Sequence, residues 1–187
     1  MEEEVELILE DTRERMNSPL HRLDIELSKL RAGKASPAML ETVKVDYYGT
    51  LTPLSQVANI NTPDPRTLIV QPWEKKMIDP IEKAIMAANL GLTPVNDGSI
   101  IRISIPVLTE ERRKELVKQV KTEAETAKVS VRNIRRDANE MLKKLQKDGL
   151  PEDVAKDKEI EIQKITDATI AKIDDKVALK EADIMKV

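Results

Sequence analysis

The chain has 187 residues, with 31 Lys and Arg against 34 Asp and Glu, and a net charge of −3 at pH 7. It has no cysteine, which excludes disulfides, thiolate nucleophiles and cysteine-based zinc sites. No run approaches the roughly 18 apolar residues of a membrane span, so we expect a cytoplasmic protein with no membrane partner. With two Tyr, one Trp and no Phe, stacking on nucleotide bases is a weak prospect.

The first helix is predicted over residues 3–31. Pro19 interrupts the pattern, because proline lacks an N–H and crowds the preceding turn. We therefore expect a kink or break near Asn17 and Ser18, where Ser18 would cap a restarted segment. The apolar positions of this helix include Leu7, Ile8, Ile25, Leu27 and Leu30.

A β-rich block follows over residues 32–105. Alternation predicts a strand around residues 43–47, and further strands are expected at 57–61, 67–71 and 100–105. One short helix is predicted over 81–90, ended by Gly91, and Asn96-Asp97-Gly98 supplies a turn. We interpret this block as a small β/α/β domain inserted into a helical protein.

Helix returns after Thr109, a candidate cap, and continues to Gly149. Pro151 suits the start of a third helix, which runs to the C-terminus. The predicted fold class is α+β: residues 1–31 and 106–187 form an elongated three-helix bundle, and residues 32–105 form the insert. The seam of the third helix is predicted to contain Ile162, Ile165, Ile173, Val177 and Ile184.

The two chain crossings, near residues 32–35 and 105–107, are candidate hinges. Gly33 has wide backbone freedom, whereas Pro106 fixes one torsion, so a hinge with few directions of swing is expected. A rigid elbow remains the alternative. The hinge candidates are Ala32, Gly33, Lys34 and Pro106.

The second long helix carries a basic stripe. At 100° per residue, its cations fall within about 60° of the direction of Lys121. Residues 110–148 contain 12 basic and 8 acidic residues, so this helix carries +4 and the remainder −7. Such a face could bind phosphates, or it could be a solvated surface of local ion pairs. The stripe comprises Lys114, Lys118, Lys121, Lys128, Arg132, Arg135, Arg136 and Asn139, and a neighbouring apolar stripe comprises Val117, Val120, Ala124, Ala127, Val131, Ile134, Ala138 and Leu142.

Catalytic chemistry finds little support. His21 is the sole histidine and is most simply a surface or packing residue. With five glycines and no phosphate loop, nucleotide hydrolysis by this chain is not expected, and neither a metal site nor a cofactor is predicted. We expect Tyr47, Tyr48 and Trp73 to fill the core of the small domain rather than to contact a ligand.

Ordered motifs along the chain resemble those of the bacterial ribosome recycling factor family. The similarity covers nearly the whole length, although Lys34 and Lys128 stand where many members have Arg, and Pro19 is a departure. The motifs are LRAGKASP at 30–37, VDYYG at 45–49, EKAI at 82–85, LGL at 90–92, LTEERRK at 108–114, VRNIRRDAN at 131–139 and IQKITD at 162–167.

This resemblance implies an L-shaped, non-enzymatic translation factor with a hinge between its domains. Such a factor binds the 70S ribosome after termination, along large-subunit ribosomal RNA. Elongation factor G then acts with it, at the expense of GTP, to separate the subunits and release mRNA and tRNA. The RNA-contacting positions that it implies are Arg132, Arg135 and Arg136, with Lys121 and Lys128 as neighbours.

Two other hypotheses stay open at this point. A helical adaptor would use its charged faces to bind another protein, independently of ribosomes. An RNA-cleaving or RNA-modifying enzyme is disfavoured because no acid/base pair is evident. We expect a monomer, since three helices can bury their seams against each other.

Overall fold

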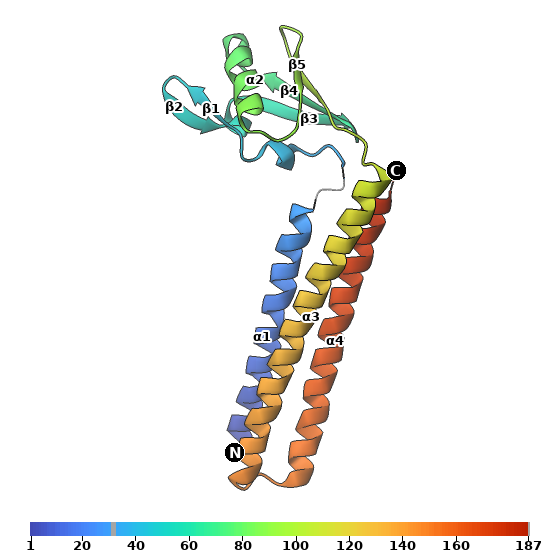
Figure 1. Cartoon of the computed structure of the whole chain (residues 1–187). Helices are drawn as coiled ribbons and strands as arrows, with labels where there is room; N and C mark the ends of the chain where they lie inside the picture. The colour runs from blue at the N-terminus through green and yellow to red at the C-terminus, as the bar shows by residue number, and fades with distance from the viewer. Residues whose placement is uncertain (31–32, 187) are drawn as a thin grey trace. The chain divides into compact units, whose positions relative to one another are not determined.

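A computed structural model describes residues 1–30 and 33–186. The chain folds as two compact units, Met1–Arg31 with Glu110–Val187, and Ala32–Thr109. The first unit is helical and the second contains all the strands (Figure 1). The fold is therefore α+β and mainly helical, as predicted.

Three long helices build the first unit: α1 (Glu2–Lys29), α3 (Glu110–Lys147) and α4 (Glu152–Met185). Each contacts the other two. The turn between α3 and α4 passes through Gly149, whose φ of +115° favours glycine. Figure 1 shows the N-terminus beside this turn, and the Met1 side chain lies 3.2 Å from where a Cβ on Gly149 would sit.

The buried seam of α3 repeats at three and four residues, as an amphipathic helix requires. It matches the predicted apolar stripe except at one end, where Leu116 is buried and Val117 is only half-buried. On α1 the apolar residues Leu7 and Ile25 are exposed. The helix buries instead Val5, Leu9, Thr12, Met16, Pro19, Leu23 and Leu27.

The seam of α4 includes two threonines that hydropathy does not select. Thr166 and Thr169 are buried, and each hydroxyl donates to the carbonyl oxygen four residues earlier, at 2.8 Å. This hydrogen bond gives the threonine hydroxyl a partner within its own helix, so the side chain can be buried with its methyl group against the core. Of the predicted seam, Ile165 and Val177 are only half-buried.

Pro19 does not break α1, so of the predicted kink or break, the break is absent. The helix is continuous from Glu2 to Lys29, with Pro19 inside it and buried. Ser18 therefore caps no restarted segment. The packing of α1 against two long neighbours compensates for the hydrogen bond that proline cannot donate.

The second unit contains two antiparallel sheets and one helix. Strands β1 (Lys44–Tyr47) and β2 (Thr50–Pro53) form a hairpin. A four-stranded sheet has the order β3-β4-β6-β5, and α2 (Ile78–Ala87) contacts β5 and β1. Short 3-10 helices lie at Pro37–Leu40, Leu54–Gln56 and Lys75–Met77. The sheet strands are β3 (Ala58–Asp64), β4 (Thr67–Pro72), β5 (Pro94–Asn96) and β6 (Ile101–Ser104).

The core of this unit is aliphatic, with Val45, Leu68, Val70, Ile81 and Ile103 all fully buried. Strands β2 and β5 were not predicted; each includes a proline, Pro53 or Pro94, which weakens the strand pattern in so short a run. The helix α2 begins and ends three residues earlier than the predicted range of 81–90.

Candidate nucleic-acid interface

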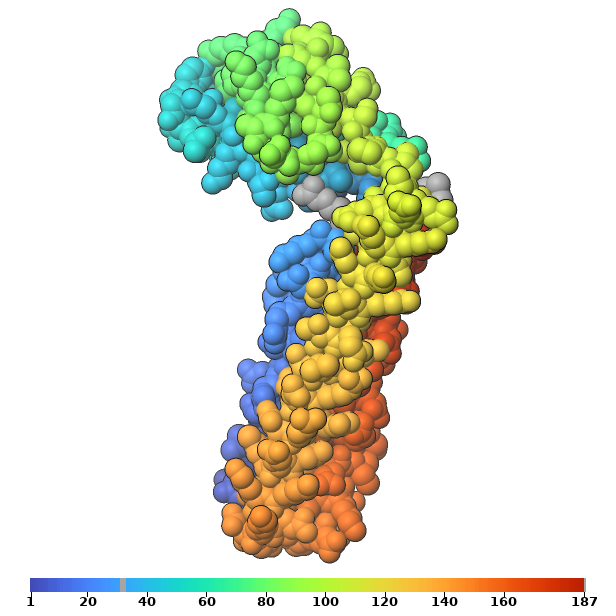
Figure 2. Space-filling model, in the orientation of Figure 1, coloured from blue at the N-terminus to red at the C-terminus, as the bar shows by residue number. Residues whose placement is uncertain are grey.

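The basic stripe occupies the solvent side of α3. Lys121 and Arg136 are exposed, while Lys128, Arg132 and Arg135 are half-buried. Figure 2 shows side chains of α3, in yellow to orange, forming a surface along the length of the bundle. All five candidate residues thus reach the surface of a single rigid element.

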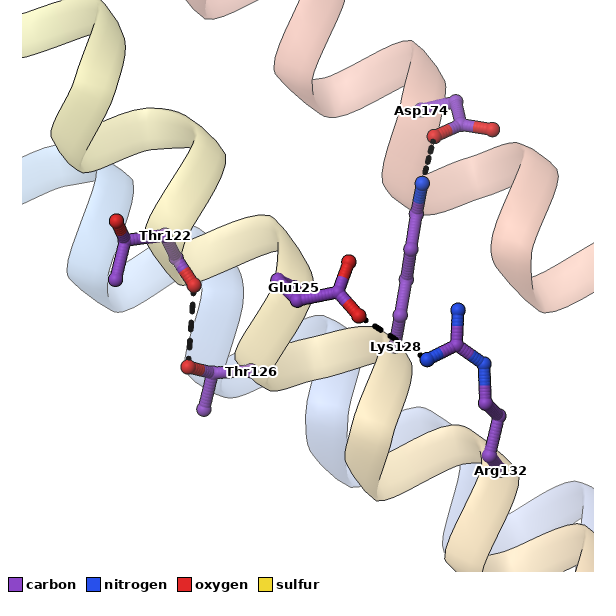
Figure 3. Close-up of polar contacts among 6 residues, drawn as sticks. All are labelled: Thr122, Glu125, Thr126, Lys128, Arg132 and Asp174. Carbon is purple, nitrogen blue, oxygen red and sulfur yellow. Dashed lines mark hydrogen bonds and ion pairs between the residues drawn. The ribbon is translucent and has the colours of Figure 1, made fainter.

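Two of these cations form ion pairs (Figure 3). The Lys128 Nζ lies 2.8 Å from Asp174 Oδ1 on α4, and the Arg132 Nη1 lies 3.1 Å from Glu125 Oε1, two turns earlier on α3. The sequence placed Glu125 beside Lys121 and Lys128 as a candidate for local ion pairs, and in the structure it pairs with Arg132 instead. Both carboxylates are exposed and both cations are partly so. Solvent-exposed pairs contribute only about 0–1 kcal/mol, so we expect a phosphate to replace either carboxylate at small cost.

Arg135 and Arg136 differ from these two. Among residues 1–30 and 33–186, no carboxylate lies within ion-pair distance of either guanidinium, nor of the Lys121 ammonium. Their donors are therefore directed to solvent. Each guanidinium can offer a planar fork of N–H groups to phosphate oxygens.

Asp137, the acidic residue of the 131–139 segment, pairs with α1 rather than with the stripe. Asp137 accepts from Arg15 on α1 at 3.0 Å, across the groove between these helices. Asn139, which the helical wheel places in the stripe, is half-buried, and its Oδ1 is buried without a hydrogen-bond partner in the described part of the chain. At the N-terminal end of the stripe, the Lys114 Nζ lies 3.8 Å from Glu110 Oε1.

The hinge candidates lie at the edge of the second unit. Gly33 has a φ of +73°, and a Cβ on it would come within 2.8 Å of the Leu108 Cγ. Lys34 is half-buried and Pro106 is exposed. Ala32 lies outside the described residues.

Both chain crossings are anchored to the turn between β3 and β4. The Ala35 N–H donates to the Pro65 carbonyl, and the Ile105 N–H donates to the Arg66 carbonyl, each at 2.7 Å. With Leu108 packed on Gly33, these bonds explain why the second unit extends to Thr109 rather than to residue 105.

The aromatic residues depart from expectation. Tyr48 is 66% exposed and Trp73 is 59% exposed, so the prediction that they fill the core was wrong. Only Tyr47 packs against the core. The core of this unit consists of aliphatic side chains and methionines, with Tyr47 packed against them.

His21 is exposed on α1. Within residues 1–30 and 33–186, no three His, Cys, Asp or Glu side chains gather as a metal site would require. None of the helices in these ranges has both the length and the apolar composition that a bilayer crossing requires.

Fold and site together define a class of protein: a three-helix bundle with an inserted antiparallel β domain and a cationic face on its longest helix. A sequence model of the family described as "Ribosome recycling factor" matches residues 23–185. The chain therefore belongs to the ribosome recycling factor family.

Individual relatives match this chain over all or most of its length. The chain is 56% identical over 187 residues to the ribosome-recycling factor of Flavobacterium psychrophilum, covering 100% of both chains. It is 58% identical over 173 residues to that of Porphyromonas gingivalis, covering 92% of this chain and 93% of the relative.

Solved structures show the same fold. A solution structure of the ribosome recycling factor matches with a TM-score of 0.74 and 38% identity, over 98% of both chains. The T. thermophilus factor, from models that place it and E. coli elongation factor G on the E. coli post-termination complex, matches with a TM-score of 0.62 and 48% identity. That match covers 97% of this chain and 99% of the other.

Proposed function

We propose that this chain recycles ribosomes by binding the post-termination complex and, with elongation factor G, promoting separation of the subunits and release of mRNA and tRNA. The observation that carries the proposal is the match to family members over the whole chain, including a relative named with both partners. In this mechanism the chain catalyses no reaction, and GTP hydrolysis belongs to elongation factor G.

The bundle is proposed to bind large-subunit ribosomal RNA through Lys121, Lys128, Arg132, Arg135 and Arg136. Support comes from the solvent-directed guanidinium groups of Arg135 and Arg136, in a segment, residues 110–148, with a net charge of +4. Phosphate contacts of this kind release counterions, so the affinity should fall steeply as salt is added.

The hinge is proposed to comprise the chain around residues 31–34 and 106–109. Ala35 and Ile105 are fixed to the turn between β3 and β4, so rotation has to occur outside those two residues. Gly33 and Pro106 lie within these segments, together with Ala32 and Lys34.

Cosedimentation with 70S ribosomes across a salt series tests the RNA site. The variant Arg135→Ala/Arg136→Ala should bind about 10-fold or more weakly, and its salt slope should fall by about 1 for each phosphate that the variant no longer neutralises. Arg13→Ala/Arg22→Ala is the matched control, because it removes two exposed guanidinium groups from α1.

Equal losses of affinity in both variants would show that only net charge matters and would remove the stripe as a defined site. A subunit-splitting assay with and without elongation factor G tests the function itself. Absence of splitting with the unmodified chain would contradict the proposal.

A further inference from the structure

The three helices of the bundle do not share the same sign of charge. Helix α3 contains 12 basic and 7 acidic residues, a net charge of +5. Helix α1 contains 4 basic and 9 acidic residues, a net charge of −5, and α4 contains 6 basic and 10 acidic residues, a net charge of −4. Two of the three helices therefore carry an excess of acid, although the ligand proposed for the bundle is a polyanion.

Cations of α4 are used for contacts inside the bundle. The Lys176 Nζ lies 2.8 Å from Asp24 Oδ1, and the Lys158 Nζ lies 3.7 Å from Glu6 Oε1. Both lysines are half-buried, and both pairs cross the seam between α4 and α1. These pairs link two helices of like net charge, and they leave fewer cations on the outer side of α4.

Other carboxylates of α1 and α4 face solvent. Asp157 and Asp175 are 18 residues apart, which is about five full turns, so they share one direction on α4, roughly 150° from the buried Ile162 and Ile173. Glu14 lies roughly 160° from the buried Met16 on α1. All three acids are exposed, and within residues 1–30 and 33–186 none of their carboxylates has an ion pair or hydrogen bond.

The range of electrostatic interactions decides what these three carboxylates can do. At physiological salt the screening length is about 8 Å, whereas the axes of packed helices lie about 8–10 Å apart and their outer side chains lie farther apart. Charges on the outer sides of α1 and α4 therefore barely weaken phosphate binding to the stripe on α3. A phosphate placed directly against them would be repelled.

Solubility alone does not explain this segregation. Interspersed charges of both signs on every side of the bundle would keep the chain soluble equally well. A bundle of three long helices offers three elongated sides to an RNA, and only α3 has the proposed contacts. Specific recognition commonly combines attraction at the correct surface with repulsion at the wrong ones.

We propose that the outer sides of α1 and α4 form a rejecting surface, defined by Glu14, Asp157 and Asp175, which prevents ribosomal RNA from binding the bundle on the wrong side. The chain then docks through α3 in a single rotational orientation about the bundle axis. This inference rests on the proposed function, because it presupposes the contacts between α3 and ribosomal RNA.

Charge reversal in the full chain tests the rejecting surface. The reversed variant is Glu14→Lys/Asp157→Lys/Asp175→Lys, which changes the net charge from −3 to +3. Folding should be retained, because the three side chains are exposed and make no contact that the substitutions would break. The neutral variant Glu14→Gln/Asp157→Asn/Asp175→Asn removes the repulsion without adding ammonium groups to the outer sides.

The matched control makes the same change of net charge on α3. It is Glu111→Lys/Glu115→Lys/Glu140→Lys, at three exposed positions of that helix. Cosedimentation with 70S ribosomes measures binding. Subunit splitting with elongation factor G, at saturating concentrations of each variant, measures the maximal rate.

We expect both lysine variants to bind ribosomes more tightly than the unmodified chain. Only the reversed variant should lose maximal splitting rate, by about threefold or more, because three sides of the bundle would then compete for the RNA and one of them is productive. The neutral variant should show a smaller fall in the same direction.

An unchanged maximal rate in the reversed variant would overturn the inference. Equal falls in the reversed variant and the control would also overturn it, since net charge rather than the side of the bundle would then matter. If melting curves show that the reversed variant is unfolded, the neutral variant decides, and an unchanged maximal rate there overturns the inference. Failure of the unmodified chain to split ribosomes would instead contradict the proposed function.

Discussion

At the scale of single residues, the candidate interface contains a carboxylate that would compete with phosphate for an arginine. Glu125 lies among the cations of α3 and holds the Arg132 guanidinium at 3.1 Å (Figure 3). An anion in this position both orients the arginine and weakens the local positive potential. These two effects oppose each other, and their magnitudes decide the outcome of a substitution.

We expect Glu125→Gln to strengthen ribosome binding by about 1.4- to fivefold, corresponding to the roughly 0.2–1 kcal/mol typical of exposed ion pairs. Glu123→Gln is the matched control, because it removes the same charge from the same helix on the side that faces α1. Cosedimentation at fixed salt measures both. Weaker binding of Glu125→Gln would show that orientation of Arg132 outweighs the charge.

The Glu74 carboxylate provides a pH dependence in the small unit. The hydrogen bond from Tyr47 lowers the pKa of Glu74, with a second contribution from the Tyr48 hydroxyl. A lowered pKa in the folded state stabilises the fold above the unfolded value of about 4.3, and this stabilisation is lost as pH falls through the folded value.

We therefore expect the thermal stability of the chain to decrease below a pH of about 4.3, and Glu74→Gln to show a shallower decrease. Some dependence should remain in the variant, because backbone N–H groups of Ile100 and Ser99 also lower the pKa of Asp97. Melting curves between neutral pH and a pH of about 3, below the unfolded pKa, measure the effect. Identical slopes for the variant and the unmodified chain would contradict this account.

At the scale of elements, periodicity predicted the long helices well because each presents many turns to its neighbours. The seam of α3 was identified to within one residue at its end. The same reasoning failed at Pro19, where the packing of α1 against its neighbours outweighs the tendency of proline to break a helix. It also failed at Thr166, a polar residue that is buried because its hydroxyl donates to the Ile162 carbonyl of the same helix. The strands β2 and β5, each of which includes a proline, were not found from the sequence.

Neighbouring isoleucines of α4 allow a test of the seam. Ile162 is fully buried and Ile160 is 55% exposed on the same helix. We expect Ile162→Ala to lower the free energy of unfolding by about 2–5 kcal/mol, and Ile160→Ala to change it by less than about 0.5 kcal/mol. Urea denaturation measures both values. A similar loss of stability in the two variants would contradict the observed packing of α4.

At the scale of the whole molecule, the candidate site was predictable because it lies on one continuous helix. Spacing alone places Arg132, Arg135 and Arg136 on a common face. The hydrogen bonds from Tyr47 and Tyr48 to Glu74 were not predictable in the same way, since they join a hairpin to a residue after β4. No periodicity connects such segments, and the scarcity of aromatic residues led us to expect these rings in the core instead.

The hinge proposal is tested by Gly33→Ala. A Cβ at Gly33 would meet the Leu108 side chain at 2.8 Å with a φ of +73°, whereas Gly98, with a φ of +94°, has nothing within 4 Å. Both substitutions carry the backbone strain of an alanine at positive φ, about 1–2 kcal/mol, but only Gly33→Ala crowds the crossing.

We expect Gly33→Ala to slow subunit splitting while ribosome binding stays unchanged, and Gly98→Ala to leave both unchanged. Stopped-flow light scattering measures splitting, and cosedimentation measures binding. Normal splitting by Gly33→Ala would show that the crossing near residue 33 does not need the freedom proposed for it.

The scarcity of aromatic residues has a practical consequence. Trp73 is the only tryptophan, and it is 59% exposed. Replacement with fluorotryptophan would place a single fluorine reporter on the small unit without introducing a cysteine or adding a dye. Its ¹⁹F resonance would then record when that surface leaves water, during assembly with either the ribosome or the GTPase.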